Sequence, residues 1–535
     1  MVPGVIPKEN STSELNYNPK NTLRWRYMQL HQMFIQNAKK YNKRNAIVDR
    51  TLNRTFSYGK ALIAALLLAK KLKPIKENFI GIMLPNSAAC ILSILGSLIS
   101  GKIPVMINYS VGAGENAKYA QKKCSFHPII TSKKLLERID CPPIDGMIFI
   151  EDIMEGISKI DKIKAALFSK FPTFIILSKV YRGEDHDDAL ILFTSGSEKL
   201  PKAVELTHKS IMSNVWGVCE RLQINENDSF LSILPFFHIF GQTATFWLPI
   251  YSGTSMVTYH NPLEYKTVVE IIREEKVTFL LATPAFYMGY LRQAKQGDFD
   301  SVRIAVAGAD KTPDWLREKF INEHNLTLFE GYGTTETSPV ISVNIPCANR
   351  PGSVGQPLPG VEVKIADINT GESLPPNQEG KIMVKGDLVM KGYYDDIEET
   401  SLRIVNGWYE TGDMGLLDEG RYLWHRGRLK RFVKIAGEMV SLVMVEYHLE
   451  KVLEGNKECC VVEIPDPRKG AKIIAVITSK TDEKELLNKL RQHVPPIALP
   501  KKVIVVDELP KMPSGKADFR TTTKLVIKQL EESKS

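Results

Sequence analysis

Short apolar runs alternate with amphipathic segments over roughly the first 300 residues of the chain. Ala189–Phe193 and Val277–Ala282 are apolar runs of strand length, so they predict buried strands. Leu30, Phe34 and Ala38 recur at the spacing of one helix face and predict a helix around them. Strand-like runs that alternate with helical segments predict an α/β fold.

The stretch Phe79–Gly101 carries no formal charge, so a membrane span has to be considered. Pro85 interrupts the stretch after six residues, and serines dilute the remainder. We therefore predict a buried strand–helix–strand unit, with a strand at Phe79–Leu84, a helix at Ala88–Ser100 and a strand at Ile103–Ile107.

The amino-acid composition of the chain changes twice along its length, which suggests separate domains. Residues 1–22 are rich in Asn, Ser and Pro and predict a loose leader. From about residue 340 to 425, Gly and Pro become frequent and the apolar runs shorten, which predicts a β-rich subdomain. We expect a body of residues 23–429 and a terminal βα domain of residues 430–535. The strands expected in the β-rich part are Val361–Ile365, Lys381–Val384 and Tyr422–Trp424.

Positive charge is concentrated near the N-terminus. The whole chain has a formal charge of +9, whereas residues 1–76 hold 15 basic and 3 acidic side chains, an excess of 12. This segment is either a solvated basic surface or a face for an acidic partner or an anionic membrane.

The cysteines and the first residues indicate a compartment. Seven cysteines are scattered without a C-x-x-C pair or a Cys/His cluster, which fits a reducing cytosol. The start Met1–Val5 lacks the charged and then apolar layout of a secretory signal. We expect a cytoplasmic protein, with peripheral contact at the inner membrane face as a further hypothesis and no nucleic acid partner.

The segment after Ala189–Phe193 has the composition of an anion-binding loop, with hydroxyls, a glycine and two lysines. Small residues let backbone N–H groups crowd around an anion, and Lys202 adds charge. Such a loop suits a polyphosphate, and a polar surface loop is the plain alternative. Its residues are Thr194, Ser195, Gly196, Ser197, Glu198, Lys199 and Lys202.

A second segment imitates a phosphate loop. Gly96–Lys102 fits the first seven positions of a P-loop, but Ile103 replaces the hydroxyl residue that should hold Mg²⁺. Its lysine precedes a predicted strand, whereas the motif requires a strand before it. We interpret this match as chance.

Two further segments combine glycine with chemically useful side chains. Leu234–Gly241 places His238 beside three phenylalanines, and the bracketing Pro and Gly predict a turn. The segment would suit the wall of a hydrophobic substrate tunnel, or His238 is a core histidine whose hydrogen bonds are satisfied. Glu330–Glu336 is a glycine loop whose Tyr332 could stack on a purine and whose Glu336 could hold Mg²⁺, or it is a plain turn.

Three later segments carry isolated charges at turns. Trp408–Asp413 ends in a carboxylate that could accept ribose hydroxyl hydrogens. Gly427–Glu438 is basic and lies at the expected domain border, and Lys511–Lys516 places a lysine in a Pro/Gly turn. Taken singly, each is equally well explained as an ordinary turn, linker or tail.

Taken in order, these motifs resemble the adenylate-forming superfamily of acyl-CoA synthetases, luciferases and peptide-synthetase adenylation domains. The similarity runs from about residue 27 to 525. The chain is most similar to acyl-acyl carrier protein synthetases and to the synthetase half of 2-acylglycerophosphoethanolamine acyltransferase, on the residues Gly101–Tyr109, Ser195–Glu198 and Gly427–Leu442.

The resemblance implies an α/β fold with a large N-terminal domain of two helix-flanked sheets plus a small β-barrel. A small mobile α+β lid domain follows it at the C-terminus. The implied reaction has two steps, in which a carboxylate attacks the α-phosphate of ATP and a phosphopantetheine thiol then takes the acyl group.

The resemblance also implies site residues. Phosphates would be bound by Thr194, Ser195, Gly196, Ser197, Glu198 and Lys202, with Thr334 and Thr335 at the α-phosphate side. Thr194 and Glu336 would hold Mg²⁺. The adenosine would be held by Gly308, Ala309, Tyr332, Gly333, Asp413 and Arg428. The acyl pocket would include Phe237, His238, Gly241 and Gln242. Lys430 would be the hinge, and the catalytic set would be Lys516, Glu336, Thr335 and His238.

The chain departs from the family pattern at two loop positions. Lys199 and Ala203 stand where many relatives have glycine, which puts the mobility of the loop in question. None of the ten histidines has an aspartate five positions later, so we expect no glycerolipid acyltransferase here.

We expect a fatty acid ligase that uses ATP and Mg²⁺ and forms a thioester on acyl carrier protein. A long-chain fatty acid–CoA ligase, with coenzyme A as the acceptor, is the alternative. A non-catalytic adenylate- or acyl-binding protein is the alternative of a different class.

Overall fold

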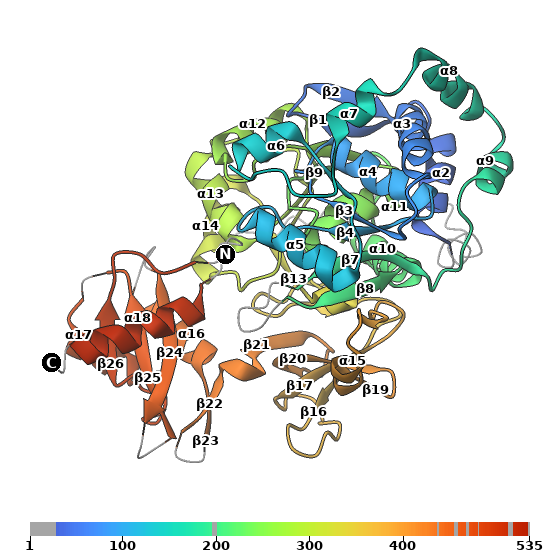
Figure 1. Ribbon diagram of the computed structural model, residues 1–535. Coiled ribbons are helices and arrows are strands. Elements are labelled where there is room, and N and C mark those ends of the chain that lie inside the picture. The colour runs from blue at the N-terminus through green and yellow to red at the C-terminus, as the bar shows by residue number, and fades with distance from the viewer. Residues whose placement is uncertain are drawn as a thin grey trace.

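The computed structural model has the expected α/β architecture, with a large N-terminal domain and a small C-terminal lid domain (Figure 1). The described residues are 28–194, 201–435, 438–453, 458–466, 470–479, 481–511 and 517–532. The predicted leader, Ser195–Leu200 and Lys516 lie outside them. All seven cysteines are described and none forms a disulfide.

One sheet of the N-terminal domain has seven strands and is parallel at its centre. It contains the predicted strand–helix–strand unit, because β3 and β4 pair in parallel and α4 connects them. In sheet order the strands are β18 (Gly392–Tyr393), β8 (Ala203–Thr207), β7 (Asp188–Phe193), β4 (Ile103–Met106), β3 (Phe79–Ile82), β5 (Ile129–Thr131) and β6 (Met147–Phe149).

A second sheet has nine strands and is also parallel at its centre. The strand predicted from Val277 begins two residues later, because the Val277 N–H donates to the Ile272 carbonyl and closes the preceding helix. In sheet order the strands are β15 (Gln356–Pro357), β14 (Val340–Val343), β13 (Leu328–Gly333), β12 (Ile304–Ala307), β11 (Phe279–Ala282), β9 (Ser229–Ser232), β10 (Ser255–Thr258), β1 (Asn45–Asp49) and β2 (Arg54–Ser57).

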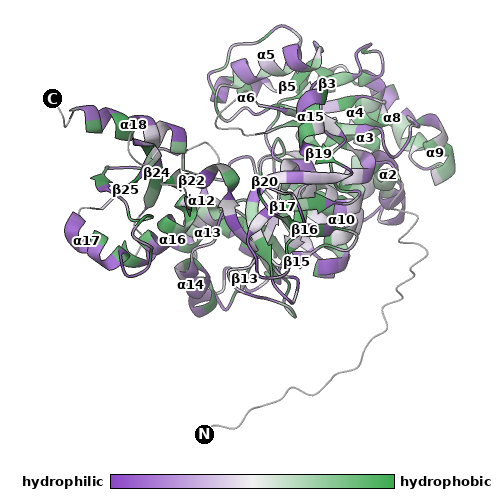
Figure 2. Cartoon of the chain, turned by 90° about the horizontal axis from the view of Figure 1, so that it is seen from below, coloured by the Kyte–Doolittle hydropathy of each residue, from purple (hydrophilic) through white to green (hydrophobic). Residues whose placement is uncertain are grey.

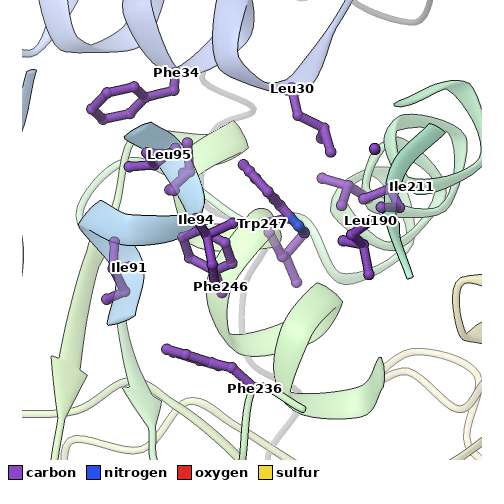
Figure 3. Close-up of a cluster of buried hydrophobic side chains, with 14 of the residues drawn as sticks. Leu30, Phe34, Ile91, Ile94, Leu95, Leu190, Ile211, Phe236, Phe246 and Trp247 are labelled. Carbon is purple, nitrogen blue, oxygen red and sulfur yellow. The ribbon is translucent and has the colours of Figure 1, made fainter. Parts of the chain in front are cut away.

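The main core lies between the two sheets and is built around α4 (Ala88–Ile99). Figure 3 shows Ile91, Ile94 and Leu95 of this helix facing Phe246 and Trp247. The helix predicted from Leu30 is α2 (Leu30–Lys40), whose buried face adds to the same core. The helices around it are α3 (Tyr58–Leu72), α10 (His208–Leu222), the π-helix η1 (Phe240–Trp247) and α11 (Leu248–Ser252).

The charge-free stretch is a buried helix. α4 has 12 residues, too few for the roughly 20 that a membrane span needs. Among the described residues, no helix is long and apolar enough to cross a membrane. Gly96 lies inside α4 where a Cβ would come within 2.8 Å of Leu68 of α3, so this glycine serves close helix packing and the P-loop match is fortuitous.

The remaining helices of the N-terminal domain lie on the outer faces of the sheets or in connections (Figure 1). They are α5 (Ala113–Cys124), α6 (Lys133–Arg138), α7 (Ile150–Glu155), α8 (Lys159–Phe168), α9 (Thr173–Lys179), α12 (Tyr265–Glu274), α13 (Pro284–Gln293), α14 (Asp314–His324) and α15 (Ile397–Arg403).

The β-rich subdomain is a five-stranded antiparallel sheet beneath the two large sheets in Figure 1. All three strands expected there are present. Its strands are β16 (Glu362–Ala366), β17 (Gly380–Lys385), β19 (Ile404–Val405), β20 (Trp408–Leu417) and β21 (Leu423–Arg428).

The lid has its own hydrophobic cores on the two faces of a three-stranded sheet. A single turn of 3-10 helix, η3 (Leu429–Arg431), connects β21 to it. Its elements are β22 (Phe432–Ile435), β23 (Glu438–Ser441), α16 (Leu442–Leu453), β24 (Cys459–Asp466), β25 (Gly470–Ile477), α17 (Glu483–Leu490), β26 (Lys502–Val505) and α18 (Phe519–Glu532).

Candidate active site

A cleft of about 2020 Å³ lies where the two sheets, the β-rich subdomain and the lid meet. Most of the motifs singled out in the sequence contribute to its wall. The predicted residues that line it are Thr194, Lys202, Phe237, His238, Gly241, Gly308, Ala309, Tyr332, Gly333, Thr334, Thr335, Glu336, Asp413 and Arg428.

The two ends of the predicted phosphate loop are fixed to each other where β7 ends and β8 begins. The Thr194 N–H donates to the Lys202 carbonyl at 2.9 Å, and the Lys202 N–H donates to Thr194 Oγ1 at 3.1 Å. This double hydrogen bond closes the hairpin that carries residues 195–201. Ser195, Gly196, Ser197, Glu198 and Lys199 lie outside the described residues.

The Lys202 side chain belongs to a network of ion pairs that the sequence did not predict. Its ammonium forms an ion pair with Glu399 and lies 4.7 Å from the centre of the Tyr393 ring. Glu399 also binds Arg403 at 3.1 Å, and Arg403 lies 3.5 Å from Glu410. Glu399 and Arg403 are four residues apart on α15, a spacing that predicts a helix ion pair but not one at a phosphate loop.

Glu336 is positioned by the same tyrosine. The Tyr393 hydroxyl donates to Glu336 Oε1 at 2.9 Å, and the Glu336 carbonyl accepts from the Met390 N–H at 2.7 Å. Thr335 and Glu336 belong to a short 3-10 helix capped by Thr334. Tyr393 therefore connects the glycine loop to Lys202, and Glu336 presents carboxylate oxygen to the cleft.

Asp413 lies at the centre of a buried polar group. It is 2% exposed, and its Oδ2 accepts the Tyr332 hydroxyl at 2.5 Å and lies 3.8 Å from His425 Nε2. Arg428 Nε lies 3.1 Å from Oδ1, yet Oδ1 receives no well-directed hydrogen bond from the described residues. β20 and β21 pair Asp413 directly with Arg428, so strand register brings them together.

The charge state of this group follows from its neighbours. Burial alone raises the pKa of Asp413, but His425, Arg428 and the Tyr332 hydroxyl outweigh it and hold that pKa below its ordinary value. The charge of Asp413 raises the pKa of Arg428. Asp413 is therefore a buried carboxylate anion whose Oδ1 is paired with Arg428 but lacks a well-directed hydrogen bond. His425, whose ring centre lies 5.0 Å from that of Tyr332, was not predicted.

Two glycine positions of the predicted adenine site are closely packed. A Cβ on Gly308 would lie 3.2 Å from the Phe240 ring, and one on Gly333 would overlap the Pro339 carbonyl. Ala309 has a φ of 70°, so the chain turns sharply after β12. Side chains at positions 308 and 333 are therefore excluded by close packing on either side of the cleft wall that includes Tyr332.

The aromatic segment forms the entry to a π-helix, a feature often found at functional sites. Phe237 stacks edge-on against Tyr109, with ring centres 5.0 Å apart, and the His238 ring lies 4.7 Å from that of Phe237. A Cβ on Gly241 would come within 2.4 Å of the Leu234 carbonyl, so the turn requires glycine.

Gln242 does not line the cleft, in contrast to the expectation that it belongs to the acyl pocket. It is fully buried. With its amide oriented to satisfy its neighbours, it donates to the Phe236 carbonyl at 2.7 Å and accepts from the Trp247 indole at 3.2 Å. It therefore supports the π-helix from behind.

The predicted hinge lies between two anchored arginines. Arg428 is paired with Asp413 on the N-terminal side. Arg431 binds Glu446 of α16 at 2.5 Å and lies over the Phe519 ring at 3.8 Å, so it belongs to the lid. Lys430 stands between them in η3, at the position where the chain passes from the β-rich subdomain to the lid.

The lid contributes a wall of the cleft through α16 and α18. Lys311, which follows β12, lies 3.6 Å from the centre of the Tyr447 ring, and Lys451 lies 3.8 Å from Asp314. These few contacts are the kind that a mobile domain can exchange.

Comparison with known proteins identifies the family to which this chain belongs. A family model described as AMP-binding enzyme matches residues 34–394, and one described as AMP-binding enzyme C-terminal domain matches residues 453–516. The long-chain-fatty-acid–CoA ligase of Bacillus subtilis (strain 168) is 30% identical over 477 residues, which cover 82% of this chain and 84% of that protein. The 4-coumarate–CoA ligase 2 of Petroselinum crispum is 28% identical over 522 residues, covering 92% and 93%.

Solved structures share the fold over nearly the whole chain. The o-succinylbenzoate CoA synthetase from Bacillus subtilis, in complex with its acyl-adenylate intermediate, matches with a TM-score of 0.80 and 23% identity over 93% of this chain and 98% of that one. ATP-bound MatB from Rhodopseudomonas palustris matches with a TM-score of 0.80 and 22% identity over 94% and 100%. With both family models matched in order, the chain belongs to the AMP-binding enzymes of the adenylate-forming superfamily.

Proposed function

We propose that this protein is an ATP-dependent ligase that joins a fatty acid to a phosphopantetheine thiol through an acyl-adenylate. The observation that carries the proposal is the buried Asp413 carboxylate, whose Oδ1 lacks a well-directed hydrogen bond and which lines the same cleft as Thr194 and Lys202 at the ends of the phosphate loop. A buried acceptor of this kind is costly unless a ligand completes it. A ribose hydroxyl is a suitable donor.

The part of the cleft around Lys202 suits a polyphosphate. Lys202 carries the positive charge at the loop, and Glu399 holds its ammonium there. A phosphate group would compete with Glu399 for this ammonium. The Lys202 charge would therefore be in place before the phosphate binds. Ser195, Gly196, Ser197 and Glu198 would supply the rest of the loop.

The chain also offers oxygen ligands for Mg²⁺. Thr194 and Glu336 both line the cleft. This fits Mg²⁺, which proteins usually hold with one or two side chains plus phosphate oxygens and water. Bound there, Mg²⁺ would neutralise charge on the phosphates.

The proposed first step forms a mixed anhydride. A substrate carboxylate oxygen attacks the α-phosphorus, and the bond from that phosphorus to the bridging oxygen of the β-phosphate breaks, releasing pyrophosphate. Because the step brings anions together, Lys516 would bridge the carboxylate and the α-phosphate, with Thr335 at the α-phosphate. In the second step, a thiolate sulfur attacks the acyl carbon and AMP leaves.

An apolar wall supports a fatty acyl substrate. Phe237, Phe240 and Ala244 come from the aromatic segment and the π-helix, and His238 is the polar side chain beside them. Leu281 and Val306 at the ends of β11 and β12 extend the wall. An acyl chain bound there would gain roughly 0.8 kcal/mol for each buried CH₂.

The acceptor has two candidates with the same reactive group. The resemblance of Gly101–Tyr109 and Gly427–Leu442 to carrier-protein synthetases favours acyl carrier protein. The names of the curated relatives, which are CoA ligases, favour coenzyme A. Both present a phosphopantetheine thiol, so the proposed chemistry is common to them.

Pyrophosphate exchange into ATP tests the proposal. We expect exchange that depends on an added fatty acid, measured over a panel of about C6 to C18, since burial grows with chain length. Coenzyme A and holo-carrier protein offered in parallel then identify the acceptor. Binding of ATP and fatty acid without exchange for any acid would instead favour a non-catalytic adenylate- or acyl-binding protein.

A further inference from the structure

The segment from α7 to α9 exposes an unusual number of large apolar side chains. Six lie between residues 154 and 174, and each is at least half exposed. They are Met154 (51%), Ile160 (63%), Ile163 (60%), Leu167 (58%), Phe171 (50%) and Phe174 (71%). Soluble proteins rarely group such residues without a partner for them.

Helix α8 carries apolar residues on two faces. Phe168 is partly buried against the main core, and the Lys70–Asp161 ion pair at 2.6 Å ties the helix to α3. Ile160, Ile163 and Leu167 follow one another at the i, i+3, i+7 spacing of a single helix stripe and are all exposed. The inner face therefore anchors the helix, and the outer stripe has no covering element among the described residues.

Exposed lysines accompany this stripe. Lys159, Lys162 and Lys164 lie on α8 itself, and Lys170 and Lys179 lie at α9. None of the five forms an ion pair with a described residue. Asp161, the one acidic residue of α8, is already paired with Lys70. We call these five lysines and the six exposed apolar side chains the α8–α9 surface.

The basic N-terminal part of the chain joins the α8–α9 surface. The Lys39 ammonium donates to the Ser169 carbonyl at 2.9 Å, and that of Lys71 donates to the Gly156 carbonyl at 2.6 Å. With Lys70 bound to Asp161, three lysines of the N-terminal charge excess contact this one segment. Part of the N-terminal charge excess therefore adjoins the segment that carries the exposed apolar stripe.

The α8–α9 surface is remote from the cleft. In Figure 1 and in the perpendicular view of Figure 2, α8 and α9 lie at one edge of the N-terminal domain and the lid at the opposite edge. Figure 2 also shows hydrophilic and hydrophobic segments side by side on α9.

We propose that the α8–α9 surface docks the protein on an anionic lipid bilayer. An apolar helix stripe flanked by lysines is the arrangement that lies in the interface between lipid headgroups and acyl chains. Neutral apolar surface alone would equally suit a protein, but the added cationic charge complements anionic headgroups. The inference is independent of the proposed chemistry, although a ligase held there would meet fatty acids where they partition.

Vesicle flotation of the full-length protein tests the proposal, with phosphatidylcholine vesicles compared with phosphatidylcholine–phosphatidylglycerol vesicles. We expect binding to the anionic vesicles only. The triple substitution Ile163→Ser, Leu167→Ser and Phe174→Ser should lower the partition coefficient by about tenfold or more. Lys162→Glu with Lys164→Glu should lower it by about fivefold for each lysine.

Matched controls separate this surface from general stickiness. Leu52→Ser with Ile321→Ser removes comparably exposed apolar side chains elsewhere, and Lys484→Glu with Lys501→Glu reverses exposed lid lysines. Both control variants should bind vesicles as the wild type does, and thermal unfolding checks that every variant is folded.

Three results would overturn the proposal. The first is equal binding to neutral and anionic vesicles, and the second is unchanged binding of both α8–α9 variants. The third is a wild-type protein that binds no vesicle but self-associates in sedimentation, with the association lost in the serine variant. That last result would make the same surface an interface between copies of the chain.

Discussion

At the scale of single residues, the cleft depends on polar groups that are buried but incompletely satisfied. Asp413 retains its charge because His425, Arg428 and Tyr332 surround it, although burial opposes ionisation. Its Oδ1 still lacks a well-directed hydrogen bond. Such a group costs stability until a ligand donates to it.

Asp413→Asn should therefore weaken the use of ATP. An amide is a poorer acceptor than a carboxylate, and the loss of a charged hydrogen bond costs about 1.5–3 kcal/mol, or roughly ten- to a hundredfold in kcat/KM for ATP. Pyrophosphate exchange at varied ATP concentration measures it. Asp418→Asn is the matched control, because Asp418 is a nearby carboxylate that does not line the cleft and accepts a hydrogen bond from the Trp424 indole. An unchanged KM for ATP would place the ribose elsewhere.

Lys516→Ala should separate the two half-reactions. This lysine lies outside the described residues, and its role is implied by the resemblance alone. Loss of one preorganised charge should slow adenylation by about a hundredfold or more while sparing transfer from supplied acyl-adenylate. Lys511→Ala, which alters a lysine of the same turn bound to Glu458, should leave both steps intact. Equal loss in both steps would contradict the assignment.

Sequence reasoning named several side chains that the structure brings together, but it did not name the residues that contact them. Tyr332, Asp413 and Arg428 were all named from motifs, and the structure brings them together. Tyr393 and Glu399 were missed because the sequence separates them widely from Glu336 and Lys202, and only the fold makes them neighbours. Tyr393 reaches Glu336 because β18 pairs with β8 at the edge of the seven-stranded sheet, and Glu399 follows on α15, an arrangement that no local pattern encodes.

At the scale of elements, the two domains are connected by a single short turn of helix. η3 has three residues, and the arginines at positions 428 and 431 are fixed to opposite sides. Any rotation of the lid would therefore be absorbed by the dihedral angles near Lys430.

Lys430→Pro should allow adenylation and block the thioester step. Proline fixes φ and removes a backbone donor, so one lid orientation is retained. Release of pyrophosphate and formation of thioester are measured in the same reaction. Lys430→Ala removes the same side chain but keeps the φ freedom, so it should preserve both steps. Thioester formation at the wild-type rate in the proline variant would show that the lid pivots elsewhere.

A pair of buried histidines joins α2 to α10. His208 Nδ1 accepts the Leu30 N–H at 3.2 Å, and the rings of His31 and His208 are 5.8 Å apart. Burial lowers the pKa of His31 to about 4, with an opposing contribution from its hydrogen bond to the Tyr181 carbonyl. Burial also lowers the pKa of His208.

Stability should therefore fall on acidification. Below the ordinary histidine pKa of 6.5, the unfolded chain takes up protons that folded His31 excludes, so the free energy of unfolding decreases until the pH reaches about 4. For His31 alone the loss at pH 5 is about 2 kcal/mol. Denaturant unfolding between pH 7 and 5 measures the slope, which His31→Gln should flatten. The exposed His186→Gln is the control, and equal slopes in all three proteins would refute this account.

The elements themselves were largely predictable. Hydrophobic periodicity located α2, and the charge-free run with its Pro85 break located β3, α4 and β4. The π-helix at Phe240–Trp247 was not foreseen, since Leu234–Gly241 was interpreted only as a turn. Its geometry depends on Gln242 bridging Phe236 and Trp247, a contact that periodicity cannot reveal.

At the scale of the whole molecule, the distribution of charge separates two surfaces. α2 and the segment from α7 to α9 lie on the side of the N-terminal domain opposite the lid (Figure 1). The cleft, in contrast, includes residues of the lid in its wall. Among the basic residues at the end of α2 and just after it, Lys39 is engaged with Ser169 and Arg44 with Glu226. Lys40 and Lys43 remain exposed.

Lys40→Glu with Lys43→Glu should therefore leave thioester formation unchanged with either coenzyme A or holo-carrier protein as the acceptor. Both lysines lie at the end of α2, far from the lid, so their charges should instead contribute to binding of anionic vesicles, which ought to decrease by about fivefold for each reversal. Steady-state kinetics with the two acceptors and flotation of the same variant measure the two effects. A raised KM for carrier protein alone, with vesicle binding intact, would make the end of α2 the docking face of an acidic carrier. The positive charge of the N-terminal segment would then serve the acceptor and not the membrane.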